Sequence, residues 1–173
     1  MSVIFYSILG FLVFVLLFGT FFIVRQQSAA VVERFGRFVS VRHSGLQIKI
    51  PIIDRVSGRV SLRVQQLDVV VETKTKDDVF VKIKVSVQYK VIKDKVFDAF
   101  YKLDFPQDQI TSYVFDVVRA EVPKMILDDV FEKKDDIAIA VKSELNDSML
   151  NYGFDIIKTL VTDIDPDAQV KDS

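Results

Sequence analysis

The chain has 173 residues, with 23 Lys or Arg, 24 Asp or Glu, one His, no Cys and no Trp. This length provides for one domain, or at most two small lobes. The absence of Cys excludes disulfide bonds, thiolate metal sites, cysteine nucleophiles and a palmitoyl anchor. Because position 2 is Ser and not Gly, N-myristoylation is excluded as well.

The first part of the chain predicts a membrane anchor. Residues 3–24 contain no charged side chain, and as a helix they would be about 33 Å long, enough for a hydrocarbon core of about 30 Å. A cleaved signal peptide would have a shorter apolar core preceded by basic residues, and a helix in the core of a soluble protein would have a polar side that faces solvent. The segment has neither feature. We therefore expect an anchor helix over residues 1–25. Its predicted membrane-spanning residues include Val3, Phe11, Phe14, Phe18, Phe22 and Val24.

The charge after this segment changes sign along the chain. Residues 25–63 carry eight basic and two acidic side chains (+6), residues 64–127 are balanced, and residues 128–173 carry five basic and twelve acidic ones (−7). Basic residues beside a span favour the cytosolic side, and the periplasmic side is the alternative. The predicted juxtamembrane contacts to lipid headgroups are Arg25, Arg34, Arg37 and Arg42.

Two interpretations of this charge gradient stay open. It could pair neighbouring domains head to tail, in which case association would weaken as the salt concentration rises. It could equally orient a single domain, with its basic side toward lipid and its acidic side toward the cytosol.

The middle of the chain predicts short strands separated by Gly, Pro and Asp. Strands are expected over residues 29–35, 38–41, 47–50 and 59–65, with a loop over residues 54–58. A hairpin follows, with arms 67–75 and 79–91. In its second arm the odd positions are apolar and Lys82, Lys84 and Lys90 stand at even ones, which is typical of a half-buried strand. A nucleic-acid surface would interleave basic residues with exposed aromatic ones, and only Phe80 points outward here, so no nucleic-acid partner is expected.

From Asp94 the apolar period becomes helical. We expect a short helix before Pro106, a second one from Gln107 that Pro123 bends or ends, and a third from Asp135–Asp136 to a stop at Gly153. Residues 154–162 then return to a strand. A strand after helices is expected to rejoin the earlier sheet, which gives an α+β fold: an N-terminal transmembrane helix followed by a domain of mixed strands and helices.

The search for chemistry predicts no catalytic, cofactor-binding or metal site. The chain has no phosphate-binding Gly loop and no G-x-S-x-G nucleophile elbow. Its one His, His43, is interpreted as a surface turn residue. Adjacent acids such as Asp77–Asp78 and Asp135–Asp136 are interpreted as helix caps and dipole partners. The run Asp163-x-Asp165-x-Asp167 has the spacing of the first three ligands of a calcium-binding loop. Ala168 stands where that loop requires Gly, so no dedicated calcium site is predicted.

Several long runs resemble one family. They are SLRVQQLDVVVETKTKDDVFVKIKVSVQYKV (61–91), DAFYKL (98–103), ITSYVFDVVRAEVPKMILDDVFEKKDDIA (110–138) and YGFDIIKTLVTDIDPDAQVK (152–171). They are similar to the SPFH (stomatin, prohibitin, flotillin, HflK/C; band 7) superfamily, and within it most similar to the hypersensitive-induced reaction proteins. The segment HSGLQIKIPIIDRV (43–56) resembles the approach to the domain in stomatin-like members.

The resemblance implies a non-enzymatic scaffold that lies on a membrane, assembles into rings or cages, organises microdomains and modulates membrane proteases or channels. Its implied SPFH domain covers residues 26–170 as two small subdomains with a boundary near residues 65–95. The implied partners are membrane lipid, further copies of the chain and a membrane protease or channel.

Two features depart from the family pattern. Plant hypersensitive-induced reaction proteins resemble acylated forms, whereas this chain has an N-terminal apolar segment as bacterial stomatin-like members do. Family members also continue into a long Ala/Glu/Lys-rich helix, of which residues 171–173 would be only a truncated start. The alternatives are therefore a tether or truncated regulatory subunit that does not assemble, or a membrane-bound hydrolase with carboxylates in a cleft.

Overall fold

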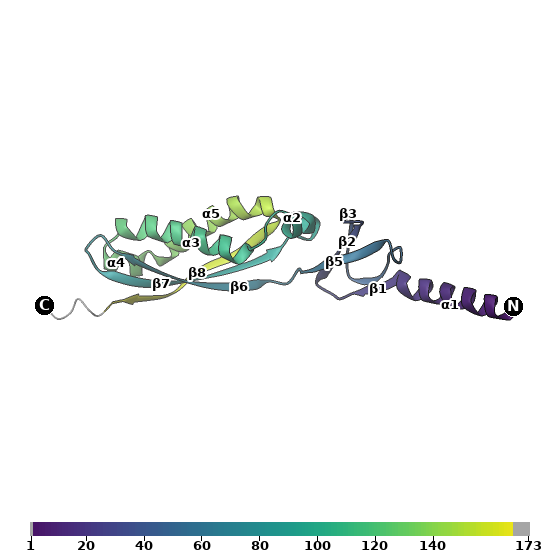
Figure 1. The fold of residues 1–173 in the computed structure, drawn as a ribbon. Helices are drawn as coiled ribbons and strands as arrows, with labels where there is room; N and C mark the ends of the chain where they lie inside the picture. Colours follow the sequence, from purple (N-terminus) through teal and green to yellow (C-terminus); the bar gives the residue numbers. More distant parts are fainter. Residues whose placement is uncertain (1, 168–173) are drawn as a thin grey trace. The chain divides into compact units, whose positions relative to one another are not determined.

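A computed structural model describes residues 2–167 of the chain and shows two compact units, residues 1–63 and residues 64–173. We call them the N-terminal unit and the C-terminal unit. Both contain strands, and the order of helices and strands in Figure 1 confirms the predicted α+β class with an N-terminal apolar helix. The predicted start of a C-terminal helix at residues 171–173 lies outside the described residues.

The N-terminal unit begins with the apolar helix α1 (Ser2–Thr20), which is about 28 Å long at 1.5 Å per residue. It ends at Thr20, five residues before the predicted end of the anchor helix at residue 25. The next four residues form strand β1 (Phe21–Val24), which pairs antiparallel with β4 (Gly45–Ile48). Aromatic and β-branched residues favour strands when a partner strand is present, and the sequence run alone does not reveal that partner.

Three further strands form a sheet in the order β3-β2-β5, with β2 (Ser28–Arg34) between β3 (Arg37–Arg42) and β5 (Asp54–Ser61). Phe35 and Gly36 connect β2 to β3 with φ angles of 49° and 78°, the positive values that a tight hairpin turn requires. The predicted loop over residues 54–58 is wrong, because β5 already begins at Asp54. Gly58 sits opposite Val31 beside a register shift, and a bulge is a place where a strand accepts Gly.

The C-terminal unit contains an antiparallel sheet in the order β6-β7-β8, formed by β6 (Gln65–Lys74), β7 (Phe80–Val91) and β8 (Phe154–Pro166). The predicted hairpin is confirmed as β6 and β7, and the late strand rejoins the sheet beside β7 as expected. One face of β7 is fully buried, as its period predicted. The buried side chains at odd positions are Val81, Ile83, Val85, Val87, Tyr89 and Val91.

Helices connect β7 to β8, and the two long ones, α3 (Pro106–Glu121) and α5 (Lys134–Met149), lie along one side of the sheet in Figure 1. The shorter helical segments are η1 (Lys93–Lys95), α2 (Val96–Tyr101), η2 (Val122–Lys124), α4 (Leu127–Glu132) and η3 (Leu150–Tyr152). The three predicted helices are confirmed, but α4 was missed.

Each long helix buries one stripe of side chains in the core. The buried residues of α3 and α5 are Ile110, Val114, Val118, Ile137, Val141, Leu145 and Met149. Pro106 occupies the first turn of α3, where its missing N–H costs no hydrogen bond, and Pro123 lies two residues after the helix ends at Glu121. Gly153 ends the helical segment with a φ of 82°, as its predicted role as a stop requires.

Candidate functional site

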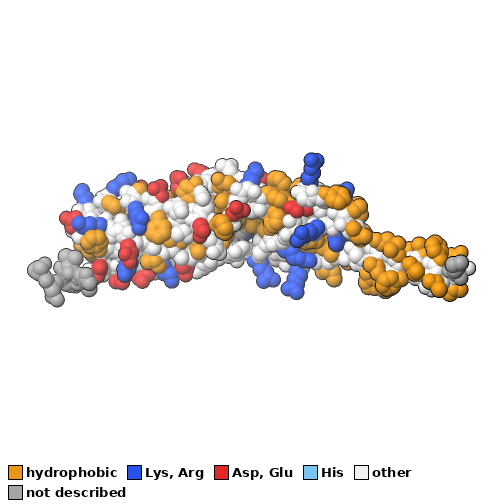
Figure 2. Space-filling view, in the orientation of Figure 1, with side chains coloured by type: hydrophobic (Ala, Val, Ile, Leu, Met, Phe, Trp, Pro, Cys, Tyr) orange, Lys and Arg blue, Asp and Glu red, His pale blue; other side chains and the backbone are white. Residues whose placement is uncertain are grey.

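The exposed apolar surface of α1 is the first candidate site, because a membrane would cover it. Val3, Phe11, Phe14 and Phe18 are between 56% and 78% exposed, and hydrophobic side chains cover most of the visible face of the helix in Figure 2, which shows no charged side chain there. Val24, which the sequence placed in the span, is only 2% exposed and lies inside the N-terminal unit on β1. Phe22 also lies on β1, so only four of the six predicted spanning residues, Val3, Phe11, Phe14 and Phe18, belong to the apolar helix.

The apolar surface continues beyond α1 onto the two-stranded ribbon of β1 and β4. Phe21 pairs with Ile48 and Ile23 with Leu46, so all four side chains share one face, and each is at least 50% exposed. We call these four residues the ribbon face. Contiguous exposed apolar surface of this kind marks protein or membrane contacts in soluble domains. Sequence reasoning missed the ribbon face because it assigned residues 21–24 to the helix.

An apolar groove connects the helix with the ribbon. It has a volume of about 410 Å³. Leu17 and Phe18 of α1 line it together with Phe21, Phe22, Ile23 and Leu46. The end of α1 and the ribbon face therefore form one continuous apolar surface.

Arg34, one of the four predicted lipid contacts, has a protein partner. Its Nε and Nη2 donate to the two carboxylate oxygens of Asp54 at 2.7 and 3.3 Å, and the backbone N–H of Ile50 donates to the same carboxylate at 3.0 Å. The hydrogen bond from Arg34 holds the pKa of Asp54 below its usual value, and Asp54 in turn raises the pKa of Arg34. This guanidinium contributes to the fold of the N-terminal unit.

The other three predicted arginines do not gather in one place. Arg37 is exposed at the start of β3, and Arg42 is half-buried at its end. The Nε of Arg42 and the Nδ1 of His43 have no hydrogen-bond partner within residues 2–167. His43 is half-buried in the connection between β3 and β4. Arg25 lies in the turn between β1 and β2.

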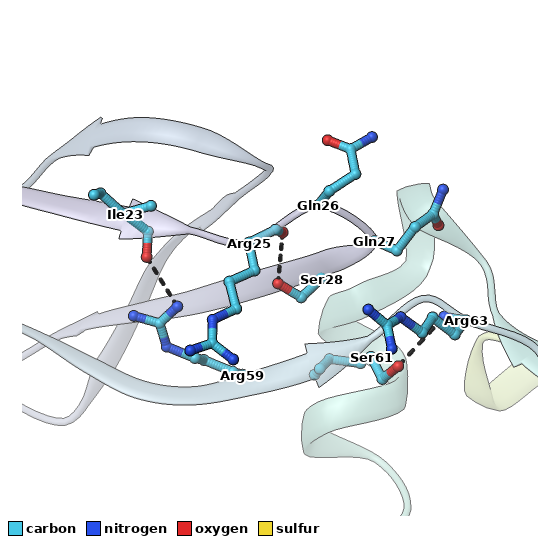
Figure 3. Close-up of a pocket in the computed structure, with 9 residues that line it drawn as sticks. Ile23, Arg25, Gln26, Gln27, Ser28, Arg59, Ser61 and Arg63 are labelled. Atoms are coloured by element: carbon cyan, nitrogen blue, oxygen red, sulfur yellow. Dashed lines mark hydrogen bonds between the residues drawn. The ribbon is translucent and has the colours of Figure 1, made fainter.

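Arg25 lines a pocket of about 820 Å³ together with two arginines that the sequence analysis did not single out (Figure 3). Arg59 is near the end of β5 and Arg63 follows it. We call this the arginine pocket. Its remaining lining residues are Ile23, Gln26, Gln27, Ser28, Val60 and Ser61, so none of the nine described residues around it is acidic.

Backbone and side-chain hydrogen bonds hold this pocket in shape. The Nη1 of Arg59 donates to the carbonyl oxygen of Ile23 at 2.9 Å, and the N–H of Leu62 donates to the carbonyl oxygen of Gln27 at 3.0 Å. Gln27 has a φ of 57°, a left-handed conformation that a residue with a side chain rarely adopts. These contacts fix the β1–β2 turn against the end of β5.

Three carboxylates of the C-terminal unit that the sequence analysis singled out, Asp77, Asp135 and Asp136, have structural roles. Asp77, at the tip of the β6–β7 hairpin, accepts hydrogen bonds from the hydroxyl of Thr75 at 2.6 Å and from the N–H of Leu127 at 3.1 Å. The bond from Thr75 holds the pKa of Asp77 below its usual value. Asp135 and Asp136 lie in the first turn of α5, where the helix dipole favours negative charge. Within residues 2–167, no cluster of three or more His, Asp or Glu side chains could hold a metal ion.

Comparison with known proteins decides the family. Residues 22–173, which include all of the ribbon except Phe21, the arginine pocket and the whole C-terminal unit, match the SPFH domain / Band 7 family. The chain belongs to this family. The resemblance in the sequence runs is thereby confirmed, and the SPFH domain begins within β1, directly after α1.

Curated relatives agree with this assignment. Hypersensitive-induced response protein 4 of Arabidopsis thaliana is 46% identical over 149 residues, which are 86% of this chain and 51% of the relative. Human mitochondrial stomatin-like protein 2 is 31% identical over 151 residues, 87% of this chain and 42% of the relative. An uncharacterized protein of Methanocaldococcus jannaschii is 29% identical over 170 residues, 98% of this chain and 84% of the relative. The chain thus spans about half the length of the first two relatives.

The SPFH domain of this chain combines charge from segments that are distant in the sequence. Arg59 and Arg63 are more than 30 positions from Arg25, and the antiparallel pairing of β2 with β5, which places Ser28 opposite Ser61, brings these segments together. The excess of basic residues over residues 25–63 was the available signal. It predicted a basic surface, but the strand register was needed to locate the pocket.

Proposed function

We propose that this SPFH-domain chain is a membrane-anchored scaffold, not an enzyme. It oligomerises on the membrane, organises membrane microdomains and modulates membrane proteases or channels. The observation that carries the proposal is α1: 19 residues without a charge, with a mean hydropathy of 2.5 and no buried side chain, joined directly to the SPFH domain. Water would have to solvate this apolar surface if no membrane covered it.

The lipid contacts follow from this arrangement. Val3, Phe11, Phe14 and Phe18 face the acyl chains, and the ribbon face continues this contact at the membrane surface. Arg25, Arg37 and Arg42 contact anionic headgroups, where each basic residue near the surface contributes about 1 kcal/mol. Arg34 contributes less to headgroup binding, because its guanidinium is held by Asp54.

Self-association is the second part of the proposal. The N-terminal basic segment and the acidic segment 128–173 carry opposite net charges of +6 and −7, which supports pairing between neighbouring copies. In Figure 2 Lys and Arg predominate over the N-terminal unit, whereas Asp and Glu are interspersed with Lys and Arg over the C-terminal unit. A tether that does not assemble is the competing function.

The mass of the extracted protein separates these two functions. We expect multi-angle scattering of the detergent- or polymer-extracted chain to show a discrete particle of many copies, which negative-stain images would reveal as a ring or cage. The particle should dissociate as the salt concentration rises from about 0.05 to about 0.5 M, because exposed charges are then screened. A monomer at every salt concentration would identify a tether, and a particle insensitive to salt would exclude pairing through the charge gradient.

We further propose that the SPFH domain faces the cytosol. The basic excess after α1 supports this orientation, and the periplasmic side is the alternative. Because the chain has no Cys, Ser44→Cys and Ser57→Cys would each provide a single exposed thiol in the N-terminal unit. An impermeant maleimide added to intact cells should leave both thiols unlabelled and should label them after lysis. Labelling in intact cells would contradict this orientation and place the SPFH domain on the periplasmic side.

A further inference from the structure

We propose that the arginine pocket is a binding site for a phosphate monoester. Its three charged residues, Arg25, Arg59 and Arg63, line one pocket of about 820 Å³ without an acidic neighbour in the lining. This inference goes beyond the scaffold proposal and does not depend on assembly, because a single N-terminal unit contains every residue of the site.

The charge distribution of the pocket favours an anion. Arg25, Arg59 and Arg63 are exposed, and three guanidinium groups around one hollow create a locally positive potential that attracts negative charge. The N-terminal unit has two acidic residues after α1, Glu33 and Asp54, and neither lines the pocket. Asp54 is bound by Arg34 instead. A bound anion would supply the compensating charge.

The arrangement of the arginines supports a defined site. In Figure 3 the three arginine side chains lie on one side of the Arg25–Ser28 turn, whereas Gln26 and Gln27 point to the other side. The carbonyl of Ile23 anchors Arg59, and the hydroxyl of Ser28 donates to the carbonyl of Arg25 at 2.8 Å. The left-handed conformation of Gln27 is held by Leu62. Strained backbone fixed by its surroundings is typical of ligand sites.

The chemistry of guanidinium identifies the class of ligand. Its planar fork of donors matches the oxygens of phosphate or carboxylate in paired hydrogen bonds. A phosphate monoester carries a charge of about −1.5 to −2 at neutral pH and three terminal oxygens, so it can satisfy more than one arginine at a time. The volume of the pocket falls within the range of about 300–1,000 Å³ found for small-molecule sites, which leaves room for the group that carries the phosphate.

The surroundings of the pocket indicate an amphiphilic source for this phosphate. Ile23 lines both the arginine pocket and the apolar groove between α1 and the ribbon. A lipid with a phosphate monoester headgroup could place that headgroup against the arginines and its acyl chain along the groove. A soluble phosphate compound would use the arginine pocket alone, so the two sources share one binding chemistry and differ in their use of the groove.

Pyrophosphate presents the same terminal –OPO3 group as a phosphate monoester and serves as the probe. Its binding to the full chain in phosphatidylcholine nanodiscs, measured by calorimetry, is the direct test. We expect one pyrophosphate per chain and a loss of affinity of about tenfold for each of Arg63→Gln and Arg25→Gln, as the loss of a charged hydrogen bond predicts. Arg59→Gln should act in the same direction, but Arg59 also supports the turn through Ile23. The matched control is Arg55→Gln, which removes the same charge from an exposed position of β5 outside the pocket and should change the affinity less than about twofold.

The source of the phosphate follows from the same titration in nanodiscs of other compositions. If phosphatidic acid in the disc weakens pyrophosphate binding, and phosphatidylserine at equal total charge does not, a lipid headgroup occupies the pocket. If phosphatidic acid has no effect, the ligand is soluble. The proposal is overturned if pyrophosphate does not bind in phosphatidylcholine discs, or if Arg55→Gln weakens binding as much as Arg63→Gln does.

Discussion

Arg34 and Asp54 face each other across neighbouring strands, and the Nε of Arg34 lies 2.7 Å from Oδ1 of Asp54. They stand at the end of β2 and the start of β5, and Asp54 also exchanges hydrogen bonds with the backbone of Ile50. The pair thus joins the sheet of the N-terminal unit to the turn that precedes β5. Asp54 is 7% exposed, so a neutral partner at position 34 would leave a buried carboxylate without its counter-charge.

This pair predicts an acid-sensitive N-terminal unit. The pKa of Asp54 is lowered in the folded chain, first by the hydrogen bond from Arg34. A carboxyl with a lowered pKa stabilises the fold above its unfolded value of about 3.9, and this contribution disappears as the pH falls through the folded pKa. We expect amide exchange in β2 and β5 to show this loss below about pH 4.

Substitutions in the same pair provide the control for this prediction. Asp54→Asn and Arg34→Gln should both reduce the stability of the N-terminal unit at pH 7 and flatten its dependence on pH. Arg37→Gln removes an exposed positive charge nearby and should leave that dependence unchanged. An equal slope in Asp54→Asn and the parent chain would contradict this assignment.

The hairpin tip of the C-terminal unit predicts a second effect, on helix α4. Asp77 accepts the N–H of Leu127, and the N–H of Lys76 donates to the carbonyl of Met125 at 2.8 Å. The first N–H groups of a helix have no partner within it, so Asp77 acts as a cap supplied by another segment. Asp77→Ala should speed amide exchange at Leu127 and in α4 by about tenfold. Glu72→Ala, on the exposed face of β6, should not, and unchanged exchange in Asp77→Ala would exclude the cap.

A third prediction concerns the backbone at Gly153. Its φ is 82°, and a Cβ added there would lie 2.5 Å from the carbonyl oxygen of Lys95. Gly153→Ala should lower the free energy of unfolding of the C-terminal unit by about 2–3 kcal/mol, through both the left-handed conformation and the collision. Gly36→Ala is the control, since its φ is 78° but no atom lies within 4 Å of the added Cβ. Gly36→Ala should lower the free energy of unfolding of the N-terminal unit by only about 1 kcal/mol, measured by denaturant unfolding or amide exchange. Equal losses would exclude the contact with Lys95.

The orientation of β7 predicts that substitutions at two adjacent positions, 82 and 83, change the free energy of unfolding by very different amounts. Ile83 is 0% exposed, whereas the Lys82 ammonium is exposed and 3.4 Å from Glu72. Ile83→Ala should lower the free energy of unfolding by about 2–4 kcal/mol because it creates a cavity. Lys82→Ala should change it by less than about 1 kcal/mol, as surface ion pairs contribute little. Urea unfolding of the two variants compares them, and similar losses would contradict the assignment of the buried face.

How much the sequence could predict depends on whether a pattern is local. The period of β7 and the stripes of α3 and α5 repeat within one element, so they were visible without the fold. Strand β1 was not, since Phe21–Val24 prolongs an apolar run and only pairing with β4 separates it from the helix. The start of β5 was hidden by Asp54 and Gly58, whose roles come from Arg34 and from a bulge.

The candidate sites divide in the same way. The apolar helix and the basic excess after it are properties of continuous segments, and composition was enough to predict them. The ribbon face and the arginine pocket depend on register: Ile23 faces the same side as Leu46, and Arg59 reaches the turn at Arg25, only because of specific strand pairs. A site assembled by antiparallel pairing across 30 residues leaves no spacing in the sequence that identifies it.

The ribbon face predicts that β1 and β4 touch the bilayer. Because the chain has no Trp, Leu46→Trp would introduce a single reporter at a position that is 66% exposed. In vesicles we expect its emission to shift to shorter wavelength and to be quenched by lipids brominated near the headgroup, since an indole ring settles at the membrane interface. Phe18→Trp, within α1, provides the reference for a residue in the acyl region, and the parent chain gives the background. Emission from Leu46→Trp at the wavelength of an indole in water, without quenching, would restrict the membrane contact to α1. Quenching would instead show that the SPFH domain lies against the lipid at its first strand, because Leu46 pairs directly with Ile23.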